Sequence, residues 1–235
     1  MIELGERLTK VASFVPKDSK VCDVGSDHAY LPVYLIHNNQ ITSAIAGEVV
    51  EGPFLSAKQT VRDYRMEDRI EVRFGDGLQI LSKDDEITAI TICGMGGELI
   101  SRILEAGYSG GHLSGEERLI LQPNVAEHFV REWLMNHSYR ITHETVVEDN
   151  HRLYEIIVAE PVEERVEYTE LEIKYGPILL KEPSELSVAK WTRMNRKNKE
   201  ILEQLQKSKT PQHEKIEQFE KAFNELQGVI DRANS

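Results

Sequence analysis

Carboxylates and a glycine follow the first predicted strand in a pattern suited to a nucleotide-like ligand. The strand 20–24 contains Asp23 and runs into Gly25-Ser26-Asp27-His28, where a helix is expected to begin. A dinucleotide fingerprint requires G-x-G-x-x-G, and Asp27 stands where its second glycine would be. A carboxylate beside a helix N-terminus repels a pyrophosphate, which disfavours NAD. The same carboxylates attract the ammonium and sulfonium of S-adenosylmethionine, whose methionine end carries no phosphate.

Three later strand ends carry groups that fit the same ligand. Glu48 ends the second predicted strand, 23 residues after Gly25, where a carboxylate can accept hydrogen bonds from both ribose hydroxyls. Asp76 follows the third strand between two glycines that let the backbone approach a base, and it can accept from an adenine amino group. After the fourth strand, the segment 94–97 is rich in glycine, and its Met95 can pack on the adenine face.

The carboxyl ends of parallel strands meet at one edge of a sheet, so these four groups together predict one cofactor site. The residues expected to contact the cofactor are Asp23, Gly25, Ser26, Asp27, His28, Glu48, Asp76, Gly77, Gly94 and Met95. Four of them have a simpler interpretation when taken alone: Asp23 and Gly25 shape a turn, Asp27 caps a helix and His28 begins one. No metal site is expected, because the sequence contains no Cys or His spacing typical of ligands.

A parallel sheet wrapped by helices is needed to bring the four strand ends together. Strands are predicted at 20–24, 44–48, 70–74, 89–93, 118–122, 141–147 and 154–160. Crossovers of roughly 20 residues separate the first five, which is long enough for a helix in each connection. A polar turn at 148–151 joins the last two strands, which are therefore expected to form an antiparallel hairpin at one edge. The predicted fold class is α/β, with a Rossmann-like sheet of seven strands.

The composition changes after Glu160, and a domain boundary is predicted near Pro161, giving domains 1–160 and 161–235. In the second domain, apolar residues recur at steps of three and four over 191–205 and again over 216–230, and Lys209-Thr210-Pro211 separates the two segments. This pattern predicts a C-terminal antiparallel coiled-coil helical hairpin. Asn198, the one polar residue on the seam of the first segment, is expected to fix its register.

Charge and composition limit the classes of protein to which this chain can belong. An apolar fraction of 40% with 29% charged residues excludes disordered and collagen-like chains. The net charge of −12 opposes indiscriminate binding of polyanions, but −11 of it lies before residue 161 and only −1 after it. Cys22 and Cys93 lie in apolar runs, which indicates a reducing compartment. No uncharged apolar run approaches about 18 residues, and the N-terminus lacks the order of a signal peptide, so a cytoplasmic location without membrane contact is expected.

Short motifs lie at or after the ends of successive predicted strands, and one more lies just before the two long helical segments. They are Asp23-Val24-Gly25-Ser26-Asp27-His28-Ala29-Tyr30-Leu31-Pro32, Ala46-Gly47-Glu48, Gly52-Pro53-Phe54-Leu55-Ser56-Ala57, Gly75-Asp76-Gly77-Leu78, Gly94-Met95-Gly96-Gly97, Leu121-Gln122-Pro123-Asn124 and Tyr175-Gly176-Pro177. In this combination the chain resembles the TrmK family of class I S-adenosylmethionine-dependent methyltransferases. The resemblance implies a bacterial enzyme that methylates N1 of adenine 22 in tRNA, with S-adenosyl-L-methionine as cofactor. The chain lacks the second glycine and the Asn-Pro-Pro-Tyr of the wider class, as expected within the narrower family.

Methylation of adenine N1 sets chemical requirements that identify further candidates. N1 carries a lone pair and is neutral at pH 7, so no general base is needed before attack, but positive charge develops on the ring. Asp27, at the mouth of the cofactor turn, is the candidate that stabilises this charge. The target base must leave its stack and be received on a platform. Tyr30, Gln122 and Asn124 are the candidates at neighbouring strand ends, although Tyr30 fits a packed core equally well and the other two fit a strand terminator.

Binding of tRNA is expected to use the second domain, where 190–199 holds five basic residues and no acid. Lys190, Arg193, Arg196 and Lys197 share one face of the predicted helix and can pair with phosphates. A solvated helix face without function is an equally good interpretation. A second basic row, interleaved with acids, consists of Arg62, Arg65, Arg69 and Arg73.

Three hypotheses follow from the sequence. The first is a tRNA adenine-N1 methyltransferase, for which tRNA is the partner and no obligate protein partner is expected. The second is a methyltransferase of the same fold that acts on a small molecule or a protein, with the tail as a docking element. The third is a non-catalytic nucleotide-binding scaffold. Detection of a methylated nucleoside in treated tRNA distinguishes the first from the others.

Overall fold

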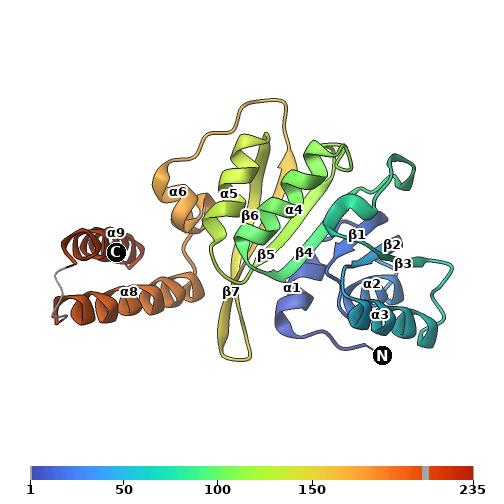
Figure 1. Ribbon diagram of the computed structural model, residues 1–235, viewed down its shortest axis with the longest axis horizontal. Helices are drawn as coiled ribbons and strands as arrows, with labels where there is room; N and C mark the ends of the chain where they lie inside the picture. The colour runs from blue at the N-terminus through green and yellow to red at the C-terminus, as the bar shows by residue number, and fades with distance from the viewer. Residues whose placement is uncertain (1, 208–211, 235) are drawn as a thin grey trace. The chain divides into compact units, whose positions relative to one another are not determined.

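Buried apolar runs form the strands of a single seven-stranded sheet in the computed structural model, which describes residues 2–207 and 212–234 (Figure 1). The strand order is β3-β2-β1-β4-β5-β7-β6. The strands are β1 (Ser19–Val24), β2 (Ile41–Glu48), β3 (Ile70–Phe74), β4 (Ala89–Met95), β5 (Arg118–Pro123), β6 (Tyr139–Asp149) and β7 (Arg152–Pro161). Strands β1 to β5 pair in parallel, whereas β7 is antiparallel to both β5 and β6. The predicted α/β class with an antiparallel last hairpin is confirmed.

Helices cover both faces of this sheet, because right-handed crossovers that leave β1 in opposite directions place their helices on opposite sides. The helices of this part of the chain are α1 (Glu6–Phe14), α2 (Tyr30–His37), α3 (Glu51–Asp63), α4 (Gly97–Ser109), α5 (Glu127–Asn136) and α6 (Glu170–Tyr175), with short 3-10 turns η1 (Gly77–Ile80) and η2 (Lys83–Asp85). The first three share one core cluster with the sheet. Helices α4 and α5 contact each other and cover the other face (Figure 1).

The β6–β7 hairpin turns at Asn150 and His151, and both residues have positive φ, of 49° and 61°. Two left-handed residues give a tight turn whose twist matches that of the flanking strands, and Asn adopts this conformation readily. The turn lies within the expected polar segment 148–151. Because β7 lies between β5 and β6, the hairpin ends the sheet at its β6 edge.

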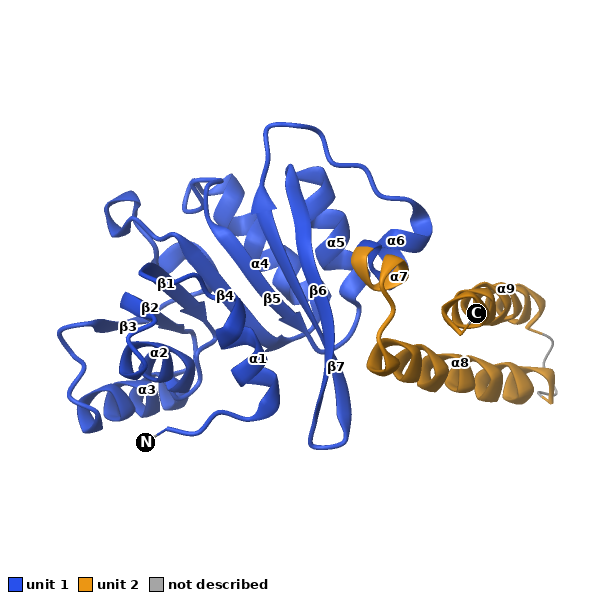
Figure 2. Cartoon of the chain, turned by 180° about the vertical axis from the view of Figure 1, so that it is seen from behind, with its two compact units in different colours: residues 1–177 blue, residues 178–235 orange. Residues whose placement is uncertain are grey.

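The chain divides into two compact units at 177/178, later than the expected boundary at 160/161 (Figure 2). Residues 162–177 belong to the first unit because they are bonded to it. The Tyr168 hydroxyl accepts from the Ile141 N–H at 2.9 Å, and the backbone N–H of Tyr168 lies 3.3 Å from the Met135 sulfur. Val166 and Tyr175 are buried. The polar composition after Glu160 therefore marks a connecting segment and not the end of the unit.

A buried ion cluster holds the end of this connecting segment. The Arg131 guanidinium on α5 is fully buried and donates to Glu144 at 2.7 Å and to Glu155. Its Nη1 also lies 3.4 Å from the carbonyl oxygens of Ile173 and Lys174 in α6. One cation thus connects α5, β6, β7 and α6, at the last helix before the second unit begins.

The second unit, described by itself, contains α8 (Glu185–Gln206) and α9 (His213–Ala233), which contact each other, and most of the short α7 (Pro177–Lys181). The two long predicted helices are confirmed, whereas the predicted helix stop at Lys209-Thr210-Pro211 lies outside the described residues. The polar seam residue differs from the expectation. Asn195, which lies four residues after Trp191, is buried and donates to the Gln227 side chain at 3.0 Å. Asn198 is partly exposed.

The observed boundary sharpens the separation of charge along the chain. Residues 178–235 contain eleven Lys and Arg against nine Asp and Glu, a net charge of +2. Residues 1–177 therefore carry a net charge of −14, which with the +2 of residues 178–235 gives the total of −12. The helices of the described part include none that is both long and apolar enough to cross a membrane.

Candidate functional site

A pocket of about 400 Å³ opens at the carboxyl edge of the sheet between β1 and β4. This is the point where successive connections leave the sheet in opposite directions, and ligands of open α/β sheets bind there. The pocket is lined by Arg7, Leu8, Asp23, Gly25, Ser26, Asp27, His28, Tyr30, Leu31, Glu48, Cys93, Gly94 and Met95. Eight of the ten cofactor residues predicted from the sequence are therefore brought together in one place.

Asp23 is buried at the floor of this pocket and is held by two hydroxyl groups. Ser26 Oγ donates to one carboxylate oxygen at 2.5 Å, and Thr91 Oγ1 donates to the other at 2.6 Å. Burial raises the pKa of Asp23 because the charged form loses its hydration, although the two hydrogen bonds oppose this effect. The carboxylate is fixed in direction and has little access to water, which suits it to a cationic ligand group.

Glu48 joins the ends of β1 and β2. Its carboxylate accepts a hydrogen bond from the Asp27 backbone N–H, and burial raises its pKa above the usual range. The carbonyl of the preceding Gly47 accepts from the N–H groups of Gly25 and Ser26, at 3.0 and 3.2 Å. The β1–α2 turn is therefore attached to the end of β2 through three backbone donors.

Close approach of two turns explains why glycine and methionine occur where they do. Gly25 has φ of 71°, and a Cβ on it would lie 2.1 Å from the Met95 Cε. A side chain at this position would displace Met95 from the pocket. Gly94 also has a positive φ, of 78°, and a Cβ there would lie 3.6 Å from the Arg7 guanidinium.

Arg7, which the sequence analysis missed, supplies a positive charge to a pocket otherwise rich in carboxylates. It comes from α1, donates to the Gln122 side chain and lies over the Tyr154 ring at 5.4 Å. Gln122 is fully buried, and its Oε1 also accepts from the Gly94 N–H at 3.1 Å. A single arginine in a short amphipathic segment before the first strand carried no signal, in spacing or motif, that linked it to the pocket.

Asp27 lies at the mouth, with its side chain 69% exposed and 3.6 Å from the His28 imidazole. It does not cap α2, because the residue before that helix is Ala29, in left-handed conformation and without a side-chain cap. The simpler interpretation of Asp27 as a helix cap is therefore excluded. His28 stacks on the exposed ring of Tyr30, with centroids 5.0 Å apart, which excludes a fully packed Tyr30.

Asn124, at the end of β5, is exposed beside the pocket. Its amide donates to the Gly94 carbonyl at 2.7 Å and accepts from Gln122 at 3.1 Å. Gln122 is thus a buried support beneath Gly94 and Asn124, whereas Asn124 and Tyr30 are accessible to a substrate.

Two predicted cofactor residues line a separate hollow of about 280 Å³. Asp76 and Gly77 lie there with Leu99, Arg102 and Ile103 from α4. Both hollows lie at carboxyl ends of parallel strands, but no side chain lines both of them. The Asp76 carboxylate is exposed to solvent.

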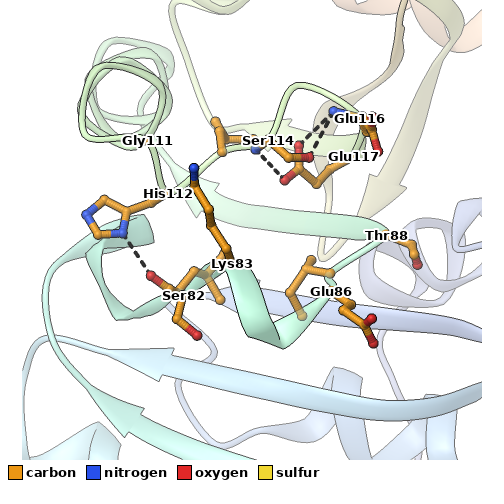
Figure 3. A pocket seen from close by; sticks show the side chains of 12 residues that line it. Ser82, Lys83, Glu86, Thr88, Gly111, His112, Ser114, Glu116 and Glu117 are labelled. Carbon is orange, nitrogen blue, oxygen red and sulfur yellow. Dashed lines mark hydrogen bonds between the residues drawn. The ribbon is translucent and has the colours of Figure 1, made fainter.

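A larger hollow, of about 530 Å³, lies at the opposite edge, before the amino ends of β4 and β5 (Figure 3). Its polar groups bond to the protein itself. The buried Glu117 accepts from the N–H groups of Ser114 and Glu116, at 2.8 and 3.1 Å (Figure 3). It also accepts from the Gly115 N–H at 3.0 Å, and the His112 Nδ1 lies 2.8 Å from the Leu81 carbonyl. This hollow lies away from the strand ends that carry the predicted ligand groups, so its size does not make it the cofactor site.

Two of the four arginines of the second basic row are engaged within the fold, whereas Arg62 and Arg65 are exposed. Arg69 donates to the carbonyls of Ile41 and Thr42, at 2.7 and 3.0 Å. Arg73 pairs with Asp85 at 2.6 Å, and this pair lowers the pKa of Asp85 to about 2. These two arginines hold β2, β3 and η2 in place.

Comparison with known proteins adds independent information about the chain. A family model described as tRNA (adenine(22)-N(1))-methyltransferase matches residues 21–228. The tRNA (adenine(22)-N(1))-methyltransferase of Bacillus subtilis (strain 168) is 41% identical over 236 residues, which cover 98% of each chain.

Solved structures give the same result. The m1A22 tRNA methyltransferase TrmK of B. subtilis is 39% identical, with a TM-score of 0.90, over 98% of this chain and 100% of that one. The TrmK of M. capricolum, determined with S-adenosyl-homocysteine, is 26% identical, with a TM-score of 0.83, over 97% and 98% of the two chains. The similarity thus extends over both units of the chain.

Proposed function

Because this chain belongs to the TrmK family of tRNA (adenine(22)-N(1))-methyltransferases, we propose that its β1–β4 pocket holds the methyl donor and that Asp27 acts on the target base. The protein is an S-adenosylmethionine-dependent methyltransferase that methylates N1 of adenine 22 in tRNA. The observation that carries the assignment of the site is the set of buried, oriented carboxylates at the sheet edge, which suits a cationic ligand.

The chemistry of the pocket fits S-adenosylmethionine. Asp23 is the partner for its ammonium group, Arg7 for its carboxylate and Glu48 for its ribose hydroxyls. Glu48 already accepts one N–H and has lone pairs left for hydroxyl donors. When bound, the cofactor supplies an activated methyl group on a sulfonium.

The protein's own residues then have three tasks. Gly25 and Gly94 leave space at the mouth, while Met95 lies against Gly25 and excludes water from one side. Asp27 stabilises the positive charge that develops on the adenine ring as N1 is alkylated, and it can take the N6 proton of the cationic product. Tyr30 and Asn124 are exposed at the mouth and can hold the base in line with the methyl group.

The decisive experiment maps the modified nucleoside. Unmodified tRNA is incubated with the protein and labelled S-adenosylmethionine, and the position of label is found by nuclease digestion and by reverse-transcription arrest. We expect 1-methyladenosine at position 22 and no label in a tRNA whose adenine 22 is replaced by guanine. Label at another position, or label in protein instead of tRNA, would support the alternative methyltransferase hypothesis.

Affinity for S-adenosylmethionine is expected to decrease as the pH is lowered. This decrease is expected to begin at a higher pH than that at which exposed carboxylates become protonated. Burial raises the pKa of Asp23 and Glu48, and protonation removes the charge that binds the ligand. The same raised pKa values mean that folding favours the protonated forms. The contribution of these two carboxyl groups to stability is present at low pH and is lost as the pH rises through their folded-state pKa values. Protonation of these groups at low pH therefore does not unfold the protein, and the weaker binding there reflects the lost charge.

Calorimetric titration with S-adenosylmethionine between about pH 8 and about pH 5 measures this effect. Glu48→Gln is expected to weaken binding about tenfold or more at neutral pH and to flatten the pH dependence, because a hydrogen bond to a charged group is lost. Glu116→Gln, at the opposite edge, removes the same charge and is expected to bind as the wild type. A pH profile unchanged by Glu48→Gln would contradict the role of Glu48.

The role of the second unit in binding tRNA is also part of this proposal. Arg193, Arg196 and Lys197 are exposed on α8, in a unit of net charge +2. Reversing all three to Glu is expected to weaken tRNA binding at least tenfold near 0.1 M salt, to make log affinity less dependent on log salt, and to leave affinity for S-adenosylmethionine unchanged. Filter binding over a salt series measures both quantities.

A matched control makes the same change of charge elsewhere in the unit. Lys207, Lys215 and Lys221 are exposed and are reversed to Glu together. If both triple variants weaken tRNA binding equally, the overall charge of the unit and not the face at 193–197 is responsible. If neither does, this helix face has no part in binding.

A further inference from the structure

Exposed apolar side chains are concentrated at the edge of the sheet that holds the cofactor pocket. Ten large apolar side chains are exposed among the described residues, and nine of them belong to unit 1. Seven of these nine lie at, or within six residues after, the carboxyl end of one of the strands β1 to β5: Tyr30, Val49, Val50, Phe74, Leu99, Val125 and Phe129. Apolar groups gathered on one face of a folded protein indicate a surface that binds a partner.

The charge at this edge restricts what that partner presents. The five turns 25–30, 48–53, 75–78, 94–99 and 123–129 contain no Lys or Arg, and each of them contains at least one Asp or Glu. Arg7 from α1 is the one Lys or Arg among the described residues that line the pocket at this edge, and its guanidinium is bonded to Gln122. The acidic turns themselves disfavour phosphate groups, whereas the faces of nucleic-acid bases are uncharged and stack on apolar and aromatic side chains. The edge is therefore suited to unstacked bases, and the positive charge needed for phosphates lies in unit 2.

The turn after β5 is bonded directly to the segment after β4. Its Asn124 N–H donates to the Met95 carbonyl at 2.7 Å, and the Gly97 N–H donates to the Val125 carbonyl at 2.8 Å. A Cβ on Gly97 would lie 2.1 Å from the Ala126 carbonyl oxygen, so this glycine allows the start of α4 to lie directly against the turn. The turn is thus fixed to the segment that carries Met95 of the pocket.

Exposed side chains project from this fixed backbone. Val125 is 63% exposed and Phe129 is 37% exposed, and the His128 and Phe129 rings lie 4.4 Å apart. Asn124, on the same turn, bonds to Gly94 at the pocket mouth, so the turn adjoins the place that the target adenine must reach.

We propose that Val125, His128 and Phe129 form a stacking platform, the β5–α5 platform, for the RNA bases next to adenine 22. The proposal rests on the proposed function and extends it to the neighbours of the target base. Because the platform is fixed to the pocket segment, a neighbouring base stacked on it holds the sugar-phosphate backbone at a set distance from the methyl donor. Val125 and Phe129 are positioning residues in this scheme.

Steady-state kinetics of three variants test the platform: Val125→Ser, Phe129→Ala and the double variant. Loss of stacking is expected to raise the KM for tRNA at least fivefold for Phe129→Ala and further for the double variant. Affinity for S-adenosylmethionine, measured by calorimetry, is expected to stay unchanged. Tyr108→Ala is the matched control, because it removes an exposed aromatic ring from the far end of α4, at the opposite edge of the sheet.

A second measurement reports stacking directly. Transcripts carrying 2-aminopurine at position 21 or at position 23 are mixed with the protein, and a stacked 2-aminopurine loses fluorescence. We expect the wild type to quench at least one of the two probes, Phe129→Ala to lose this quenching and Phe129→Trp to retain it. Val125→Ser, at a position 63% exposed, keeps the test valid if the change at Phe129 lowers stability.

The outcomes separate the platform from the function itself. If the wild type methylates adenine 22 and the platform variants have unchanged KM and quenching, the platform is wrong and the proposed function stands. If the wild type methylates no tRNA, the proposed function fails first. If the variants change sedimentation of the protein while leaving the KM for tRNA unaltered, the face binds another protein molecule, which also overturns the platform.

Discussion

Replacing Asp27 by Asn is expected to lower kcat for tRNA methylation by on the order of 10²-fold, the typical effect of losing one preorganised electrostatic group. The Asp27 carboxylate lies at the pocket mouth, and its backbone N–H is held by Glu48, so the turn keeps the charge in place. Asn retains the size and the backbone contact but not the charge. Single-turnover methylation with saturating tRNA and cofactor measures the chemical step.

The control is the affinity for S-adenosylmethionine, which Asp27→Asn is expected to change by much less than the rate. Glu116→Gln serves as the matched loss of an exposed carboxylate. A full single-turnover rate in Asp27→Asn would show that the carboxylate has no part in methyl transfer. An equal loss of rate and of cofactor affinity would make Asp27 a binding residue only.

Replacing Arg131 by Met is expected to reduce the free energy of unfolding by about 3–5 kcal/mol, because Glu144 and Glu155 remain buried without their cation. The change also removes the two contacts from Arg131 to the carbonyls of α6. Urea unfolding of the whole chain, followed by circular dichroism, measures the loss. The deficit is expected to shrink toward low pH, where the two carboxyl groups become protonated.

Arg140→Met provides the comparison, because Arg140 pairs with Glu164 at 2.9 Å between two exposed side chains. Its loss is expected to cost less than about 1 kcal/mol. Equal costs for the two variants would mean that the buried cluster contributes no more than a surface ion pair. The double variant Glu144→Gln with Glu155→Gln, made in the Arg131→Met background, is expected to recover part of the stability.

The bounds of a strand were predictable where the local pattern of apolar residues covers the same residues that pair with the neighbouring strands. Residues 70–74 were predicted without error, and β1 begins one residue early, at Ser19. The start of β2 was missed because Thr42 and Ser43 are polar, yet Ser43 pairs with Lys20 of β1. Pairing with a central strand overrides a weak local preference, and that pairing cannot be read from a single segment.

The face of α8 that packs on α9 was predicted one residue away from its observed position, again because a single segment does not show where its partner lies. Steps of three and four from Trp191 fit Met194 and Ile201 as well as Asn195 and Leu202. The structure buries Asn195 against Gln227 and leaves Ile201 exposed. Only the position of the facing helix decides between two such faces.

The site was predictable wherever a residue directly follows a strand, because topology alone brings strand ends together. Asp23, Glu48 and Met95 share one pocket for this reason. Arg7 reaches the pocket from a helix far from it in the sequence, and its partner Gln122 lies 115 residues away. Contacts of this kind depend on the packing of α1 on the completed sheet.

The contact between Gly97 and the Ala126 carbonyl has a consequence for how this enzyme can change over evolutionary time. A substitution of Gly97 disturbs the pocket segment and the β5 turn together, since a Cβ would lie 2.1 Å from the carbonyl oxygen. The turn itself is held through backbone atoms. The Asn124 side chain adds a bond to Gly94, whereas the exposed side chains of Val125 and Phe129 can be exchanged without loss of these backbone bonds. Changes at these exposed positions therefore leave the backbone of the cofactor pocket in place, whereas a change at Gly97 does not.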